Sequence, residues 1–136
     1  MNKIMAEETD NKATQLRKGI LELAVMAVLY RRSHYGYSLV RSLAGPDAAG
    51  IKEGTVYPLL ARLAREGLVI SEWVESSQGP PRKYYELTAS GRAAYESLQA
   101  EFHRLVLLVE SAAGEPEPQP DPQSDKKIVI RRKKNE

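Results

Sequence analysis

The chain has 136 residues, of which 42% are hydrophobic, and a formal net charge of only +2. This length suits one small domain, which buries about two-thirds of the surface of its unfolded chain. The absence of cysteine excludes a disulfide framework and a thiolate metal site. No apolar run reaches the roughly 20 residues that span a bilayer, so we expect a soluble, cytoplasmic protein with no membrane partner.

The start of the chain contrasts with the segment that follows it. Residues 1–11 are polar and acidic, unlike a secretory signal, and we expect them to form a disordered arm. Residues 16–30, LRKGILELAVMAVLY, predict a helix that is apolar all round. Such a helix is buried on more than one face, so its second face is expected to meet a partner chain or another long helix.

Two shorter helices are expected next. Residues 38–44 predict a helix that is followed by a turn at 45–47, Gly-Pro-Asp. Residues from 53 to Gly67 predict a third helix, which the glycine ends. The inward face of this third helix follows from the spacing i, i+3, i+4, i+7 of Val56, Leu59, Leu60 and Leu63.

The start of the third helix stays open at this point. If Thr55 caps the helix, Pro58 falls in its first turn, where the N–H that proline lacks has no partner anyway. If the helix starts near Glu53, Pro58 loses one hydrogen bond and bends the helix slightly.

Two strands are expected after the third helix. Residues 68–75, LVISEWVE, and 82–88, RKYYELT, are rich in β-branched and aromatic types and predict a hairpin. Pro80 and Pro81 cannot donate to a ladder, so we expect them to end the pairing and stiffen a protruding tip. Three helices and a two-stranded wing predict a winged helix-turn-helix, whose third helix normally enters the major groove.

A long last helix is expected over 89–113, with Thr88 as its N-cap. Its apolar residues repeat with the spacing 3, 4, 3, 4, 3, which is the a/d pattern of a coiled coil. These residues are Tyr95, Leu98, Phe102, Leu105, Val109 and Ala112. The pattern predicts a dimerisation helix, with packing on its own domain as the alternative.

The composition changes at residue 114. In GEPEPQPDPQ, residues 114–123, four prolines predict an extended linker. The end of the chain, SDKKIVIRRKKNE, is basic, and three roles stay open for it: a flexible tail, a clamp on DNA or RNA, or a strand added to a sheet edge. We therefore place a winged-helix domain at 12–88, a dimerisation helix at 89–113, and a disordered linker and tail at 114–136.

Four segments carry a resemblance to a known family: LRKGILELAVMAVL (16–29), YGYSLVRSL (35–43), EGTVYPLLARLAREGLV (53–69) and GPPRKYYELTASG (79–91). In their order and spacing they resemble the PadR-like family of bacterial transcriptional regulators. The single long helix after the wing is similar to the short subgroup of that family. Two features depart from the family: Lys52 stands where relatives often have Ser or Thr, and 114–136 lies outside the pattern.

The resemblance implies a mainly α fold and a homodimer that binds double-stranded DNA, usually as a repressor. Dimer symmetry then predicts a pseudo-palindromic operator. Family members often release DNA when a small aromatic or drug-like effector binds, some of them between subunits. The alternative function is a winged-helix module for protein–protein contact that does not bind DNA.

Polar side chains opposite the inward face of the third helix, and polar or basic ones in the wing, are the predicted DNA contacts, since arginine bridges guanine or clamps phosphate. In the recognition helix they are Thr55, Tyr57, Arg62 and Arg65, and in the wing Gln78, Arg82 and Lys83. Tyr57 has an alternative role, as a half-buried residue that locks the helix to its domain. Weaker phosphate contacts are expected from Arg17, Lys18 and Tyr35.

Apolar residues of the first and last helices are the predicted dimer interface. They are Leu21, Val25, Tyr95, Leu98, Phe102, Leu105 and Val109. Met26 and Phe102 are candidates to line an effector cavity between subunits, with simple packing of the dimer core as the alternative.

An enzyme is not expected. The chain has two histidines, His34, expected at the surface, and His103, expected on a helix face. No nucleophile motif or glycine-rich phosphate loop accompanies them, and we predict neither a metal site nor a cofactor.

Overall fold

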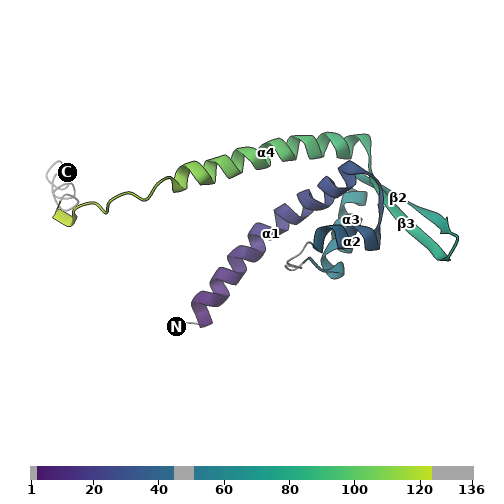
Figure 1. The fold of residues 1–136 in the computed structure, drawn as a ribbon, viewed down its shortest axis with the longest axis horizontal. Coiled ribbons are helices and arrows are strands. Elements are labelled where there is room, and N and C mark those ends of the chain that lie inside the picture. The colour runs from purple at the N-terminus through teal and green to yellow at the C-terminus, as the bar shows by residue number, and fades with distance from the viewer. Residues whose placement is uncertain (1–2, 45–50, 124–136) are drawn as a thin grey trace. The chain divides into compact units, whose positions relative to one another are not determined.

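The structure is a computed structural model, which describes residues 3–44 and 51–123 (Figure 1). Its elements are α1 (Lys3–Arg31), β1 (His34–Tyr35), α2 (Gly36–Ala44), α3 (Glu53–Arg65), β2 (Val69–Ser76), β3 (Gly79–Leu87) and α4 (Ala89–Ala113). The predicted winged helix with a long last helix is confirmed. The turn expected at 45–47 and the basic tail at 124–136 lie outside the described residues.

The chain divides into two compact units, Met1–His103 and Arg104–Glu136. The first unit contains the helices α1, α2 and α3, the sheet, and the first part of α4. The second contains the end of α4 and the proline-rich segment, whose backbone forms neither helix nor strand from 114 to 121. Alternating prolines remove the donors that a helix needs.

The core of the first unit lies where α1, α2 and α3 meet the sheet. Its buried side chains are Val25, Met26, Leu29, Leu39, Val56, Leu60, Leu63, Val69, Leu87 and Tyr95. Burial of each large apolar side chain stabilises the fold by about 1.5–3 kcal/mol. The β2–β3 hairpin extends away from this core as the wing (Figure 1).

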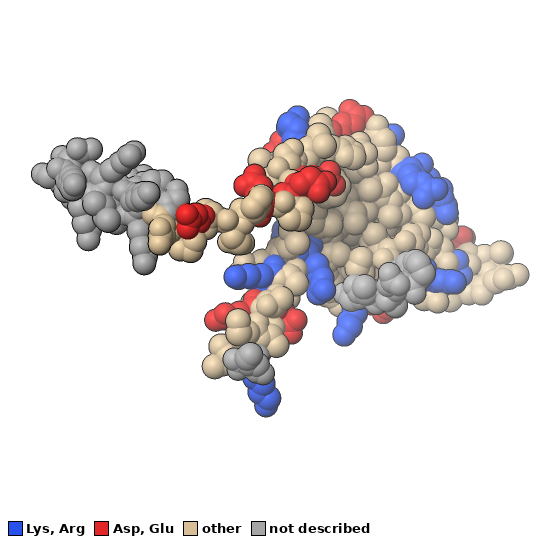
Figure 2. Space-filling view, turned by 60° about the vertical axis from the view of Figure 1, so that its left-hand side comes forward, with Lys and Arg blue, Asp and Glu red and all other residues tan. Residues whose placement is uncertain are grey.

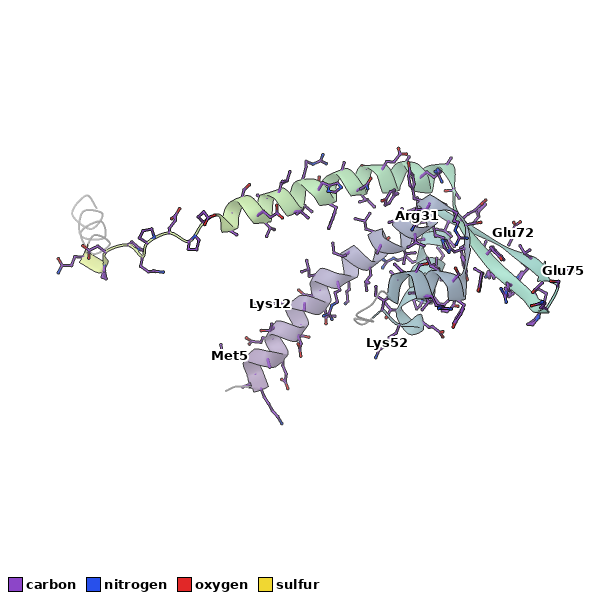
Figure 3. The ribbon with its side chains drawn as sticks, in the orientation of Figure 1. Met5, Lys12, Arg31, Lys52, Glu72 and Glu75 are labelled. Atoms are coloured by element: carbon purple, nitrogen blue, oxygen red, sulfur yellow. The ribbon has the colours of Figure 1, made fainter. Side chains whose placement is uncertain are left out.

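The first helix is longer than expected. It begins at Lys3, so residues 3–11 are helical where the sequence predicted a disordered arm. These residues are mostly good helix formers, and no glycine or proline precedes Gly19, so the packed half of the helix can propagate backwards. The N-terminal half, which carries Met5 and Lys12 in Figure 3, is exposed.

The structure settles where α3 begins and confirms where it ends. The helix starts at Glu53, after Lys52, and therefore contains Pro58 in its interior. At its end Gly67 has a φ of 77°, and its N–H donates to the carbonyl of Ala64 at 3.1 Å. Glycine adopts this left-handed conformation at no steric cost, as expected for a helix C-terminus.

The sheet has the order β1-β3-β2 and is antiparallel throughout. The prediction that Pro80 and Pro81 end the pairing is wrong, because β3 begins at Gly79 and runs through both prolines. The register shifts between Val74 and Ser76, so that two prolines of β3 lie opposite one residue of β2. A bulge of this kind accommodates residues that cannot donate to the ladder.

Hydrogen bonds fix the junction between the wing and α4. The Thr88 hydroxyl accepts from the N–H of Gly91 at 3.0 Å, which confirms the predicted N-cap. Farther along α4, the rings of Tyr95 and Tyr30 lie 4.7 Å apart. The Tyr30 hydroxyl donates to Glu96 at 2.7 Å, and this hydrogen bond is the main reason that the pKa of Tyr30 is raised.

Candidate nucleic-acid interface

The outward face of α3 carries mostly small side chains. Because Val56, Leu60 and Leu63 are buried, the helical period places a different set of residues on the opposite side. This outward face consists of Gly54, Pro58, Ala61 and Arg65, all exposed. Its short side chains allow a flat or grooved partner to come close to the helix backbone.

One side of α3 borders a hollow of about 520 Å³, which we call the aromatic hollow. Its lining residues are Tyr35, Gly36, Tyr37, Tyr57, Trp73, Arg82, Lys83 and Tyr85. The structure thus brings the predicted wing residues Arg82 and Lys83 together with Tyr57 of α3 and Tyr35 of β1.

The cations of the aromatic hollow lie over aromatic rings. The Arg82 guanidinium is 4.6 Å from the centre of the Tyr35 ring. The ammonium of Lys83 is 5.8 Å from the centres of the Trp73 and Tyr85 rings. Cation–π contacts orient a charge without neutralising it, so both cations remain able to attract an anion.

The sequence did not identify Tyr37, Trp73 and Tyr85 as part of this site. Trp73 pairs with Lys83 in the sheet, and side chains two residues apart in a strand share a face. Given the register of the hairpin, the alternation of side chains along β3 therefore places Trp73 and Tyr85 on the same face as the predicted contact Lys83.

The structure supports the locking role that the sequence left open for Tyr57, and its contact with DNA stays a prediction. A Cβ atom on Gly36 would lie 2.5 Å from the Tyr57 hydroxyl, so the ring packs closely over this glycine. Its side chain is nevertheless 41% exposed and lines the hollow. Nearby, burial raises the pKa of Tyr85, and Tyr57 adds to this shift.

The other side of α3 borders a second hollow of about 440 Å³, which we call the α1–α3 groove. It is lined by Lys18, Leu21, Gly54, Thr55, Pro58, Leu59 and Arg62. Three predicted DNA contacts, Lys18, Thr55 and Arg62, therefore lie together. Leu21, predicted for the dimer interface, lines this groove as well.

Arg62 is held by two carboxylates. Its Nη2 donates to Oε2 of Glu22 in α1 at 2.5 Å, and its Nε lies 3.8 Å from Oε1 of Glu66. Glu22 did not stand out in the sequence, because nothing local relates it to a residue 40 positions later.

The remaining predicted contacts lie outside both hollows. Arg17 is exposed on α1, Arg65 on the last turn of α3, and Gln78 at the tip of the wing. On the face drawn in Figure 2, Lys and Arg form separate small groups and no continuous basic surface.

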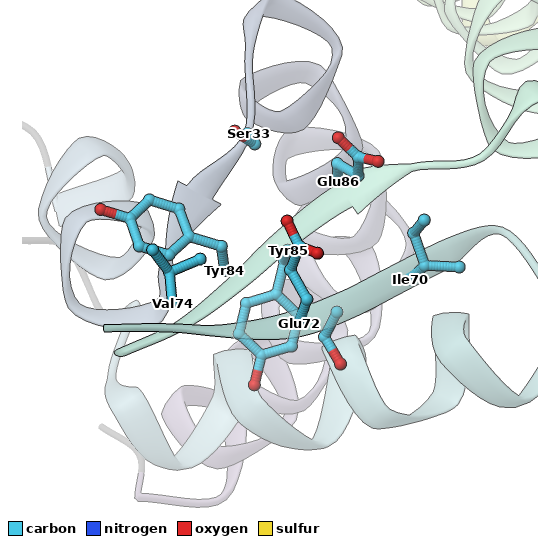
Figure 4. Close-up of a pocket in the computed structure, with 8 residues that line it drawn as sticks. Ser33, Ile70, Glu72, Val74, Tyr84, Tyr85 and Glu86 are labelled. Carbon is cyan, nitrogen blue, oxygen red and sulfur yellow. The ribbon is translucent and has the colours of Figure 1, made fainter. Parts of the chain in front are cut away.

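The wing has a second, acidic hollow of about 270 Å³ (Figure 4). Glu72 pairs with Tyr84 and Ile70 with Glu86, so these residues share the sheet face opposite to that of Trp73 and Lys83. Glu72 and Glu75 are labelled on the wing in Figure 3. Carboxylates repel phosphate, so the hollow that Glu72 and Glu86 line is unsuited to nucleic acid.

Two residues of the predicted dimer interface lie in the core of their own protomer. Val25 is 1% exposed, and Tyr95 packs against Tyr30. Because the first helix is apolar on every side, its sequence does not show which side faces the core of its own protomer and which side is free to face a partner. Leu98, Leu105 and Val109 are exposed, by 45%, 49% and 67%.

The two residues predicted for an effector cavity between subunits lie in different surroundings within one protomer. Met26 is fully buried in the core, whereas Phe102 lines an apolar groove of about 240 Å³ between α1 and α4. The residues of this apolar groove are Ile20, Leu23, Ala24, Ala27, Tyr95, Gln99, Phe102 and His103.

His34 is buried and not at the surface as expected. Its Nδ1 lies 3.0 Å from the Ser38 hydroxyl, and its side chain is 5% exposed. Burial, followed by the nearby charges of Arg32 and Arg31, lowers the pKa of His34. In residues 3–44 and 51–123 no group of three or more His, Asp or Glu residues is arranged to hold a metal ion. None of the helices in these ranges is long and apolar enough to cross a membrane.

Comparisons with known proteins agree with the fold. The model of the transcriptional regulator PadR-like family matches residues 25–97. A PadR family regulator from Eggerthella lenta is 33% identical over 85% of this chain and all of its own, with a TM-score of 0.70. A PadR-like transcription factor from Bacteroides fragilis is 41% identical, over 73% of this chain and 95% of its own, with a TM-score of 0.62.

A PadR-like regulator from Bacillus cereus is 30% identical and covers 75% of this chain and 99% of its own, with a TM-score of 0.68. The family model spans more than half of the chain, and these relatives are regulators and not enzymes. The chain therefore belongs to the PadR-like family of transcriptional regulators.

Proposed function

We propose that the chain is a sequence-specific, cytoplasmic DNA-binding repressor that acts as a homodimer. The observation that carries the proposal is the convergence of Tyr57, Arg82 and Lys83 on one hollow beside the outward face of α3. Exposed cations neutralise phosphates, and hydroxyl groups donate to them, so this hollow suits one sugar–phosphate strand.

In this proposal α3 enters the major groove with its outward face. Pro58 and Ala61 are short enough to pack against thymine methyl groups, and Arg65 reaches a guanine or a phosphate from the last turn. Lys18 and Thr55, in the α1–α3 groove, contact phosphates of the other DNA strand. Gln78, at the wing tip, and Arg17 add contacts at the edges of the site.

The proposed dimer uses exposed apolar residues of α1 and α4. Leu16 is 72% exposed and Leu98 45%, and the apolar groove lies open beside Phe102. Water contact with so many apolar side chains is unfavourable, and a helix of a second copy would remove it. Analytical ultracentrifugation should give the mass of a dimer, and a monomer at micromolar concentration would contradict this part.

A small aromatic effector is proposed to bind in the apolar groove at Phe102. The groove volume of about 240 Å³ lies below the roughly 300–1,000 Å³ of sites for drug-sized molecules, so it suits a compact aromatic compound. A molecule bound there would displace the partner's helix and change the spacing of the two α3 helices. We expect such compounds to release DNA.

The test is binding of the purified protein to DNA from upstream of its own gene, with and without a panel of aromatic compounds. We expect a complex on a pseudo-palindromic site whose half-sites lie about 34 Å apart, or a multiple of that distance. Lack of any preference for this DNA over a scrambled duplex would favour the alternative, a winged-helix module for protein contact.

A further inference from the structure

Arg62 differs from the other cations near α3 in the way its charge is held. The Glu22 carboxylate of α1 accepts a hydrogen bond from its Nη2 at 2.5 Å, and Glu66 lies 3.8 Å from its Nε. Arg65, one turn later on the outward face, has no such partner among the described residues. The guanidinium of Arg62 is thus directed towards α1 and away from the outward face.

The ion pair lies at the wall of the α1–α3 groove, where Lys18 and Thr55 are proposed to contact phosphates. The Glu22 side chain is only 26% exposed, and that of Arg62 is 48% exposed. A phosphate that approached Arg62 would compete with a carboxylate already in place, and would meet the repulsion of that carboxylate. Arg62 therefore offers little net charge to DNA while the pair is intact.

We infer that Glu22 is a positioning residue that limits the attraction of this surface for phosphate. It fixes α3 against α1 through Arg62, and it withholds one positive charge per protomer from the phosphate backbone. Since phosphate contacts add affinity for every sequence, withholding this charge lowers the affinity and the salt dependence for operator DNA and for other DNA alike. The inference rests on the proposed function, because it concerns how strongly the same surface attracts a duplex.

The experiment compares the wild type with Glu22→Gln, Arg62→Gln and the double variant. The affinities for an operator duplex and for a scrambled duplex are measured by fluorescence anisotropy across a salt series. Glu66→Gln is the matched control, since it removes the same charge from the same surroundings but leaves the Glu22–Arg62 pair in place. Circular dichroism confirms that each variant is folded.

Glu22→Gln should release Arg62 to phosphate. The slope of log affinity against log salt should become steeper by about 0.9 per protomer, and affinity for both duplexes should rise roughly three- to tenfold. The ratio of operator to scrambled affinity should stay nearly unchanged. Glu66→Gln should change each affinity less than about twofold, because Arg62 then stays paired with Glu22 and its charge is not released to phosphate.

Arg62→Gln should weaken binding to both duplexes, because it leaves the Glu22 carboxylate unpaired beside the phosphates. The double variant has neither charge, so it should regain the wild-type salt slope. It also keeps the test available if Arg62→Gln alone does not fold.

Two results would overturn the inference: a Glu22→Gln slope equal to that of the wild type, or a double variant as weak as Arg62→Gln, since Arg62 would then contact DNA itself. A wild-type chain that binds neither duplex would instead overturn the proposed function, so the two failures are distinguishable.

Discussion

The two hollows beside α3 hold positive charge in different ways. In the aromatic hollow, Arg82 and Lys83 lie over rings and pair with no carboxylate of the described residues. In the α1–α3 groove, Arg62 is bound by Glu22 and Glu66. A ring orients a cation and leaves its charge available, whereas a carboxylate neutralises it. The number of basic residues near a recognition helix is therefore a poor measure of its attraction for phosphate.

The largest expected effect tests whether both hollows depend on one scaffold. A Cβ atom at Gly91 would lie 2.0 Å from the backbone oxygen of Leu68. Gly91→Ala should therefore destabilise the fold by about 3 kcal/mol, since backbone cannot move aside as a side chain can. Urea unfolding measures the loss. Gly19→Ala, at a position with no neighbour within 4 Å of the added atom, is the control and should not destabilise.

The next largest effect is expected when the two cations that lie over aromatic rings, Arg82 and Lys83, are replaced. Arg82→Gln with Lys83→Gln should lower DNA affinity about tenfold near physiological salt and reduce the salt slope by about 1.8 per protomer. Anisotropy titrations measure both. The same charge change at Lys3 and Lys12, on the exposed half of α1, should leave the slope nearly unchanged. Equal effects of the two pairs would remove the distinction between the hollow and ordinary surface charge.

A smaller effect is expected from Gly36→Ala, which alters one hollow only. The added Cβ atom would lie 2.5 Å from the Tyr57 hydroxyl and 2.7 Å from its ring. The end of this side chain can swing away, so the cost in stability should be about 1 kcal/mol. DNA affinity should fall, and Gly36→Ala with Tyr57→Leu should recover the stability. Recovery without a loss of affinity in either variant would show that Tyr57 does not contact DNA.

The smallest effect concerns pH and involves neither hollow directly. The pKa of His34 is lowered in the fold from its ordinary value of 6.5, mainly by burial, so the unfolded chain binds the proton more readily. Stability is therefore complete above pH 6.5 and is lost as the pH falls below this value towards the folded pKa. Thermal unfolding between pH 7.5 and 5 should show the decline. His34→Gln should flatten it, and an equally steep decline in this variant would assign the proton to another group.

The sequence predicted the parts of the molecule that depend on local pattern. The inward face of α3, its end at Gly67 and the Thr88 cap follow from spacing and from the chemistry of single residues. The two hollows follow from long-range contacts, which no local pattern contains. Glu22 meets Arg62 across 40 positions, and Tyr35 meets Arg82 through a short strand that its two residues did not reveal.

Two further differences have a clear physical origin. The N-terminal half of α1 is helical although it is polar, because it continues a helix whose other half is packed. Pro80 and Pro81 remain in a strand because β1 pairs only with Tyr84 and Tyr85, so the prolines have a neighbour on one side only. Both are cases in which tertiary context decides between local alternatives.

The hydroxyl of Thr88 has a mechanical consequence. It donates to the carbonyl of Gly67 at 2.7 Å while it accepts from Gly91, and the Thr88 N–H donates to Leu68 at 3.0 Å. Hydrogen bonds to this one residue therefore link the segment that ends α3 with the first turn of α4. Because of this link, the orientation of α4, the helix proposed to join two protomers, constrains the orientation in which each protomer presents α3.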